Sequence, residues 1–173
     1  MIRRAVIVPT GDEVRDGIIV DTDSPMIRGT LLRLNPDCVV QITEAIADDP
    51  VIIRETILSA VDQEVNLIVL IGGSGGGHRH SASLGMDYTH SALDELLPDA
   101  SSGSLYGKNG HLWCRLICGQ IGQTLILNVP GPFTEAQAAI DAFIDSYRKT
   151  PGDFQEHNRR MLQAVSRQYG SHV

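Results

Sequence analysis

Residues 65–77 read VNLIVLIGGSGGG, and they are more informative about the fold than any other part of the sequence. The run from Leu67 to Ile71 is apolar throughout, which is typical of a strand covered on both faces of a parallel sheet. It leads directly into the glycine loop, residues 72–77, which has five glycines in six positions. Glycine lets backbone N–H groups approach an anionic ligand, because no side chain stands in the way. The junction therefore predicts either a phosphate site or a purely structural turn.

Strands and helices are predicted to alternate along the rest of the chain. Residues 10–17 predict a polar loop, and the helix that follows has Asp23 or Ser24 as its cap. The order β-α-β-α-β-α-β-β-β-α-α predicts an α/β fold, a three-layer α/β/α sandwich with a mostly parallel, mixed sheet. The predicted strands are 5–8, 38–42, 67–71, 104–105, 112–118 and 124–129, and the predicted helices are 23–34, one that starts at 48–50, 88–97, 134–147 and 154–169.

The length of 173 residues indicates one domain. We expect residues 1–150 to form the α/β domain. Residues 151–173 are expected to be a C-terminal helical extension of the same domain, since Pro151-Gly152 breaks the chain before a charged helix.

The composition excludes several classes of partner. The formal net charge is −7 at pH 7, whereas duplex nucleic acid requires clustered Lys and Arg. Cys38, Cys114 and Cys118 form no CxxC pair, which predicts buried reduced thiols and a reducing compartment. No apolar stretch approaches the length of a membrane span. We therefore expect a cytoplasmic protein with no nucleic-acid or membrane partner.

Three polar loops follow predicted strands, and ligands of open α/β sheets bind beyond the carboxyl ends of the strands. The loops are Thr10-Gly11-Asp12-Glu13, the glycine loop and Pro130-Gly131-Pro132. The acidic pair Asp48-Asp49 also follows a strand. Their convergence is a stronger signal of a ligand site than any one loop.

The same loops resemble the molybdopterin-binding domain family, which includes MogA, MoaB and the corresponding domains of MoeA and gephyrin. The similarity runs in order from Val6 to about Phe143. The segments that carry it are Thr10-Gly11-Asp12-Glu13, Gly17-Ile18-Ile19-Val20-Asp21-Thr22-Asp23, Asp48-Asp49-Pro50, Leu67 to Gly73, Gly85-Met86-Asp87-Tyr88-Thr89 with Leu93-Asp94-Glu95-Leu96, and Val129-Pro130-Gly131-Pro132.

This resemblance implies binding of molybdopterin, a pterin with a dithiolene and a terminal phosphate, for adenylylation with Mg-ATP or for insertion of molybdate. It implies catalytic roles for Asp48, Asp49 and Asp87, with Asp49 and Asp87 as ligands of Mg²⁺. Single-domain relatives form trimers, so the resemblance also implies a homo-oligomer. The ligand-binding residues that it implies are Thr10, Gly11, Asp12, Glu13, Gly72, Gly73, Ser74, Gly75, Gly76, Gly77, Lys108, Pro130 and Gly131.

The chain departs from the family pattern at three places. A family aspartate falls on His80 in direct register, or on Asp87 if seven residues are inserted. We favour Asp87, because the residues that flank it match the family better. Asp23 replaces the usual Asn, and the family's K-P-G-K-P segment is reduced to a glycine and Lys108.

Each predicted site residue also has a structural interpretation. The acidic pair can be only a helix cap, Asp12 and Glu13 can be turn formers, and Pro130 to Pro132 can simply shape a turn. Lys108 can be a solvated loop residue. A second set of residues has the composition of a transition-metal site, or else belongs to a polar surface loop; its members are His78, His80 and His90, with Arg79 and His111.

Three functions therefore stay open. The first is a molybdopterin-binding protein of molybdenum cofactor biosynthesis. The second is a CinA-like hydrolase of ADP-ribose-type pyrophosphates, which shares this fold. The third is a non-catalytic binder of the cofactor, in which the altered glycine loop has lost catalysis.

Overall fold

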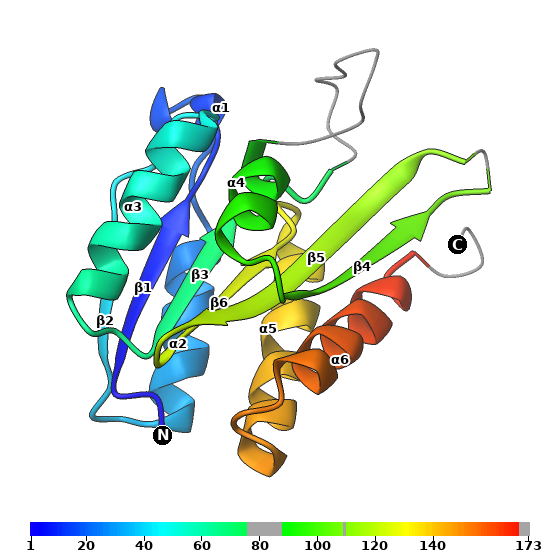
Figure 1. The fold of residues 1–173 in the computed structure, drawn as a ribbon. Coiled ribbons are helices and arrows are strands. Elements are labelled where there is room, and N and C mark those ends of the chain that lie inside the picture. Colours follow the sequence, from blue (N-terminus) through cyan, green and yellow to red (C-terminus); the bar gives the residue numbers. More distant parts are fainter. Residues whose placement is uncertain (76–87, 109, 170–173) are drawn as a thin grey trace.

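The computed structural model describes residues 1–75, 88–108 and 110–169. Within these residues, one sheet lies between two layers of helices (Figure 1). Its strands are β1 Arg4–Pro9, β2 Val39–Ile42, β3 Leu67–Ile71, β4 Ser101–Tyr106, β5 Leu112–Ile121 and β6 Thr124–Val129. The helices are α1 Asp12–Arg15, α2 Asp23–Leu34, α3 Pro50–Asp62, α4 Tyr88–Leu96, α5 Phe133–Lys149 and α6 Phe154–Ser166.

The strand order of the sheet is β2-β1-β3-β6-β5-β4. The neighbours from β2 to β6 are parallel, whereas β5 runs antiparallel to both β6 and β4. The mixed, mostly parallel α/β sheet expected from the sequence is thus confirmed. Because β1, β3 and β6 are parallel, their carboxyl ends lie at one edge, which is at the top of Figure 1.

Strand β3 is the centre of the fold, and its side chains alternate between the two faces of the sheet. Leu67, Val69 and Ile71 belong to the core that also contains residues of α2, α5 and α6. Ile68 and Leu70 belong to the core that also contains residues of α3 and α4. Helices on both faces explain why the strand is apolar throughout.

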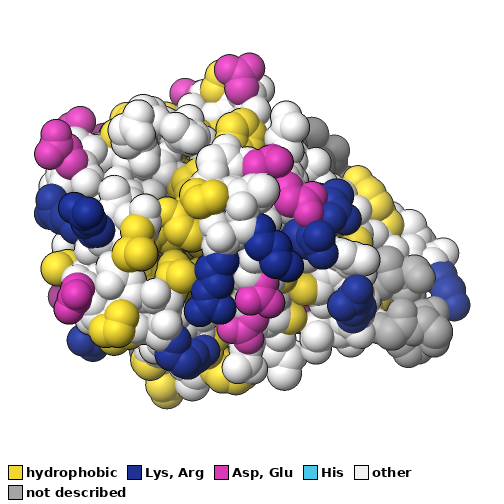
Figure 2. Space-filling view, turned by 90° about the horizontal axis from the view of Figure 1, so that it is seen from below, with side chains coloured by type: hydrophobic (Ala, Val, Ile, Leu, Met, Phe, Trp, Pro, Cys, Tyr) yellow, Lys and Arg dark blue, Asp and Glu magenta, His cyan; other side chains and the backbone are white. Residues whose placement is uncertain are grey.

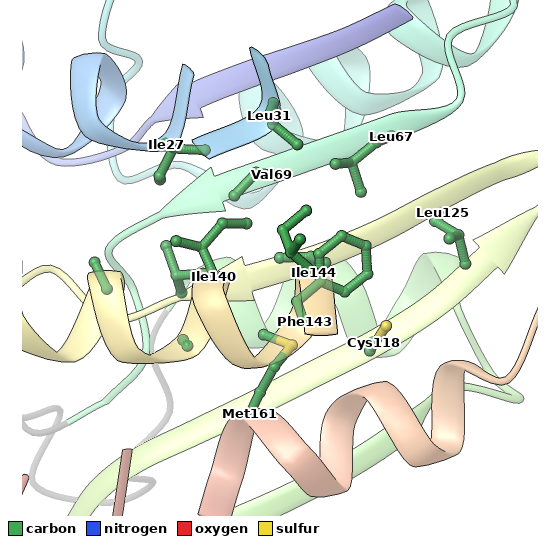
Figure 3. Close-up of a cluster of buried hydrophobic side chains, with 14 of the residues drawn as sticks. Ile27, Leu31, Leu67, Val69, Cys118, Leu125, Ile140, Phe143, Ile144 and Met161 are labelled. Carbon is green, nitrogen blue, oxygen red and sulfur yellow. The ribbon is translucent and has the colours of Figure 1, made fainter. Parts of the chain in front are cut away.

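The larger core lies under α2, α5 and α6, and Figure 3 shows how its side chains meet. Phe143 of α5 is fully buried. It lies between Val69 and Leu67 of β3 and Met161 of α6, next to Ile144. The last helix therefore packs onto the same core as the central strands.

Two helix starts show how local sequence sets the boundaries. Asp49 caps α3, since its Oδ1 accepts hydrogen bonds from the N–H groups of Val51 (2.7 Å) and Ile52 (3.3 Å). At α2 the capping carboxylate is Asp21, whose Oδ1 accepts from the N–H groups of Asp23 (3.1 Å) and Ser24 (2.9 Å). The prediction that Asp23 or Ser24 provides the cap is therefore wrong, because both residues are already inside the helix.

Some predicted boundaries also differ from the structure. Residues 10–17 contain the short helix α1. An ion pair between Asp12 and Arg15 (3.0 Å) joins the two ends of this helix. A segment of four residues with a single apolar side chain, Val14, carries no apolar periodicity, so the sequence pattern could not reveal it. The fourth strand begins three residues earlier than expected, at Ser101. Cys38, Cys114 and Cys118 are buried free cysteines, as expected.

Figure 2 shows the face at the amino ends of the parallel strands. Basic side chains on this face are interspersed with acidic and hydrophobic ones rather than gathered in one block. A continuous positive surface, which a duplex nucleic acid requires, is therefore not formed on this face. Among the described residues, no helix has the length and apolar character needed to cross a membrane.

Candidate functional site

Backbone hydrogen bonds join the carboxyl ends of β1, β3 and β6 just beyond the strands. Thr10 donates to the carbonyl oxygen of Ile71 both from its N–H and from its hydroxyl, each at 2.9 Å. Gly72 donates its N–H to the carbonyl oxygen of Val129 at 3.1 Å. The structure thus brings the Thr10 loop, the glycine loop and the loop before α5 together at one edge of the sheet.

Gly72 occupies a position that no other residue fits without strain. Its φ is +90°, and a Cβ atom there would lie 3.1 Å from Thr10 Oγ1 and 3.2 Å from the Thr10 carbonyl oxygen. A Cβ on Gly131 would lie 3.9 Å from the Gly72 Cα. Three chain segments therefore approach one another at backbone distance, and no side chain stands between them at this edge of the sheet.

The described part of the glycine loop is anchored on β5 rather than on its own strand. Arg115 donates its N–H to the carbonyl oxygen of Ser74 at 2.6 Å. Here β5 has left β6, and the buried side chain of Asn128 fills the gap. Its Oδ1 accepts from the Ile117 N–H (2.7 Å), and its Nδ2 donates to the Arg115 carbonyl (3.0 Å). The ladder between β5 and β6 thus opens toward the site, and the glycine loop enters the opening.

The imidazole ring of His90 packs against the glycine loop. Its side chain is 1% exposed, and its Nε2 lies 3.0 Å from the carbonyl oxygen of Arg115. A carbonyl oxygen only accepts, so Nε2 carries the proton in this hydrogen bond. A Cβ on Gly75 would lie 3.3 Å from His90 Cε1, so ring and loop are in close contact. This favours the structural interpretation of His90 over that of a metal ligand.

The predicted acidic site residues Asp12 and Asp48 lie near α1 and the start of α3. Ile46 accepts a hydrogen bond from the Gly11 N–H (3.0 Å), which places the chain before α3 next to α1. The carboxylates of Asp16, Asp12 and Asp48 all raise the pKa of Arg15, and the largest cause is the hydrogen bond that Arg15 Nε donates to the Asp16 carboxylate. Asp12 and Asp48 therefore already lie near a cation, with which a metal ion would compete.

Other predicted site residues are placed as follows. Pro130 is buried, and Gly131 and Lys108 are exposed, Lys108 in the loop between β4 and β5. Gly76, Gly77, His78, His80 and Asp87 lie outside the described residues. In the part of the chain that is described, no three His, Cys, Asp or Glu side chains are grouped as a metal site requires.

Asp23 is a buried carboxylic acid at the first turn of α2. It is 5% exposed, and neither its Oδ1 nor the hydroxyl oxygen of Ser24 has a hydrogen-bond partner among the described residues. Burial, reinforced by the charge of Asp21, raises the pKa of Asp23 from 3.8 to about 6. At neutral pH the folded protein must therefore hold a desolvated negative charge there.

This burial predicts a pH-dependent stability. Between pH 4 and 6 the folded state holds the proton of Asp23 more tightly than the unfolded state does, so the free energy of unfolding falls as the pH rises through this range. Asp23→Asn removes the charge and is expected to stabilise the protein by about 2–3 kcal/mol at pH 8 and by almost nothing at pH 4. Urea unfolding at both pH values measures the difference.

The matched control is Asp37→Asn, since Asp37 is exposed. This variant should keep the pH dependence of the wild type. An equal gain from Asp23→Asn at both pH values would contradict a titration of Asp23.

A pocket of about 350 Å³ lies at the opposite edge of the sheet, beside the turn between β5 and β6. It is lined by Leu97, Pro98, Asp99, Ala100, Gln120, Gly122 and Phe154. Asp99 is the one charged side chain in that lining, and the converging loops lie at the other end of the strands. We therefore place the candidate site at the carboxyl edge.

Comparison with known proteins identifies the family. A family model described as "Probable molybdopterin binding domain" matches residues 6–150. The chain belongs to this family. The resemblance seen in the sequence is thereby confirmed, and the matched region contains every segment that meets at the carboxyl edge. It ends before α6, which lies at residues 154–166.

A curated relative supports this family assignment. The molybdenum cofactor biosynthesis bifunctional protein of Chlorobaculum tepidum is 26% identical over 145 residues, which are 82% of this chain and 45% of that protein. The chain thus spans less than half the length of this curated relative.

Solved structures show the shared fold. The tungsten cofactor synthesizing protein MoaB of Pyrococcus furiosus has a TM-score of 0.63 at 18% identity, over 91% of this chain and 98% of that chain. The CinA protein of Thermoplasma acidophilum, whose function is given as unknown, has a TM-score of 0.59 at 15% identity, over 86% and 97% of the two chains. At these identities the likeness is one of fold alone.

Proposed function

We propose that this protein binds molybdopterin and acts in molybdenum cofactor biosynthesis, by adenylylation of molybdopterin or by insertion of molybdate. The observation that carries the proposal is that the loops of a molybdopterin-binding family member meet at one edge of the sheet. Homo-oligomer formation and a cytoplasmic location remain predictions.

Support for an anionic ligand comes from the approach of Gly72 to Thr10 and Gly131. The terminal phosphate of molybdopterin requires several N–H donors without side chains in front of them. Gly73 and Gly75 have positive φ values and can provide such a backbone, whereas the Gly72 N–H is already bonded to the Val129 carbonyl. The anchor at Ser74 keeps this backbone in place, which lowers the reorganisation needed when a ligand binds.

The carboxylates beside α3 fit a magnesium ion by their chemistry, since Mg²⁺ prefers one or two carboxylates together with substrate phosphates. Asp48 and Asp49 would hold it, and when bound it would neutralise phosphate charge. Asp49 orients its carboxylate through the two N–H groups that it accepts from α3. Arg15, near Asp48, would compensate the acidic charge when no metal is bound.

The proposal is tested by titration of the purified protein with molybdopterin, with and without Mg-ATP, followed by assay of AMP transfer. We expect saturable binding of molybdopterin and, for the adenylylation step, transfer of AMP from Mg-ATP. Hydrolysis of ADP-ribose without pterin binding would contradict the proposal and favour the CinA-like alternative. Tight binding with no turnover in either assay would restrict the function to that of a binder.

Asp49→Asn separates the capping role of Asp49 from its proposed metal role. Asparagine is as good a helix cap as aspartate, so the stability should change by less than about 0.5 kcal/mol. The lost charge should reduce Mg-ATP-dependent AMP transfer on the order of 100-fold, if the carboxylate holds the metal. Circular dichroism melting and the AMP-transfer assay measure the two effects.

Asp153→Asn is the matched control, since Asp153 caps α6 in the same way through its hydrogen bond from the Glu156 N–H (2.9 Å). It should leave AMP transfer unchanged. Full activity of Asp49→Asn in the same assay would remove Asp49 from the catalytic set.

A further inference from the structure

The backbone of Arg115 is held by β6 and α4 at the point where the glycine loop meets β5. Its carbonyl oxygen faces two donors, Asn128 Nδ2 and His90 Nε2, each at 3.0 Å. Its guanidinium donates to both carboxylate oxygens of Asp94, at 2.7 and 2.8 Å. These contacts fix the residue whose N–H bonds to the carbonyl oxygen of Ser74.

Asn128 makes the contact with the loop possible by its place in the sheet. The antiparallel ladder between β5 and β6 ends at the pair of Cys118 and Leu127. One step further, the fully buried amide of Asn128 replaces the backbone of β6, since it accepts from the Ile117 N–H and donates to the Arg115 carbonyl. The two strands are thus held apart by a side chain, which leaves the Arg115 N–H for the loop.

The hydrogen bond to Ser74 also sets the direction of the next donor in the loop. In a trans peptide, an N–H points opposite to the carbonyl before it, and the Ser74–Gly75 peptide is trans. Because the Ser74 carbonyl points at β5, the Gly75 N–H points away from β5, toward the side on which β6 and β3 end. Gly75 is half-buried and donates its N–H to none of the described residues, so this donor is left for a ligand.

We propose that Asn128 is a positioning residue of the ligand site: through Arg115 and Ser74 it aims the Gly75 N–H at the anionic group of the ligand. The fully buried Asn128 does this without touching the ligand. The inference rests on the proposed function, because it concerns the terminal phosphate of the same ligand. A donor that is aimed before the ligand arrives needs less reorganisation than one ordered on binding.

Asn128→Asp tests the proposal with little change of size. It keeps the acceptor for the Ile117 N–H but sets an oxygen against the Arg115 carbonyl oxygen, and this repulsion should release the loop. We expect molybdopterin binding to weaken about tenfold and dephosphorylated molybdopterin to bind within about twofold of wild type. Asn128→Thr removes the amide without adding a buried charge and should show the same selective loss, even if the charged variant does not fold. Isothermal titration calorimetry measures the affinities.

Thr124→Val is the matched control, because it removes a buried hydrogen bond at the other end of the same strand. The Thr124 side chain is 3% exposed, and its hydroxyl donates to the carbonyl oxygen of Val65 at 2.6 Å. The variant should bind both ligands like wild type. If Asn128 had only a structural role, its variants would weaken both ligands equally, and that result would overturn the inference.

Gly75→Ala tests whether Asn128 acts through this peptide. At a φ of +87°, a Cβ would lie 2.9 Å from Leu112 Cδ2 and 3.3 Å from His90 Cε1, so the variant should push the peptide away from β5. If both residues act through one donor, Asn128→Asp should weaken molybdopterin binding by less than about twofold in the Gly75→Ala background. A further loss of about tenfold in that background would show that Asn128 acts elsewhere.

Pyrophosphate, titrated into the same proteins, separates the two proposals. If wild type binds pyrophosphate but not molybdopterin, and Asn128→Asp weakens pyrophosphate binding, the positioning role stands and the proposed function fails. If wild type binds molybdopterin and Asn128→Asp changes the affinity for neither probe, the proposed function stands and the positioning role fails. If wild type binds neither, both fail.

Discussion

Gly72→Ala is expected to destabilise the protein by about 2–4 kcal/mol and to weaken ligand binding by more than tenfold. An alanine at φ +90° is strained, and its Cβ would press on two oxygen atoms of Thr10 at 3.1 and 3.2 Å. One of them, Oγ1, belongs to the hydroxyl that donates to Ile71, so relief of the contact disrupts this hydrogen bond just beyond β1 and β3. Urea unfolding and titration with molybdopterin measure the two effects.

Gly122→Ala separates backbone strain from the close approach. Gly122, in the turn between β5 and β6, has a φ of +56°, and a Cβ there would meet nothing within 4 Å. We expect a loss of about 1 kcal/mol and unchanged ligand binding. If Gly72→Ala cost no more than this control, the contact with Thr10 would not constrain the site.

Phe143→Ala is expected to lower the free energy of unfolding by about 3–5 kcal/mol. The ring is fully buried, and it meets the rings of Tyr147 and His157 at centroid distances of 5.8 and 5.3 Å. Because the contact with His157 joins α5 to α6, the cavity would loosen the packing of α6 on α5. Equilibrium unfolding in urea measures the loss.

Phe133→Ala makes the same substitution at the exposed start of α5, where the side chain is 43% exposed. It should cost less than about 1 kcal/mol. Equal losses for the two variants would show that the core beneath α5 collapses around the cavity and does not depend on this ring.

The central part of the fold was predictable because its pattern is local. The uninterrupted apolar run of β3 predicts a strand with helices on both faces, and the alternation of its side chains between two cores fulfils this. The boundaries of α2 follow equally from its sequence, although its cap does not. Asp21, Asp23 and Ser24 are all acceptable cap residues, and only the backbone path decides which of them lies before the helix.

The support of the site was not predictable from the sequence. Asn128 looks like an interruption of an apolar strand, and only the divergence of β5 from β6 makes its amide a substitute for backbone pairing. The hydrogen bond from the Arg115 N–H to the Ser74 carbonyl joins distant parts of the chain. No periodicity connects these two residues, since their contact depends on how β5 diverges from β6. A buried polar residue inside an apolar strand was the one available signal.

The loops at the carboxyl edge also illustrate what a family resemblance adds. Thr10, Gly72 and Gly131 are common turn residues, and the chemistry of each alone is ambiguous. Their order along the chain indicated the family, and the backbone contacts between them show why the order matters. The roles of the acidic residues depend on a metal and a ligand, so they remain predictions for the assays described above.

The bonds from Thr10 to Ile71 and from Gly72 to Val129 are the last rungs of the central parallel ladder, and they join segments from distant parts of the chain. These two contacts therefore exist together only while β1, β3 and β6 lie side by side. Loss of β3, the strand that they share, removes both. A bound ligand thus stabilises the entire fold, by RT ln(1 + [L]/Kd), rather than a single loop. A ligand that binds at this edge would thereby protect the whole folded chain from degradation.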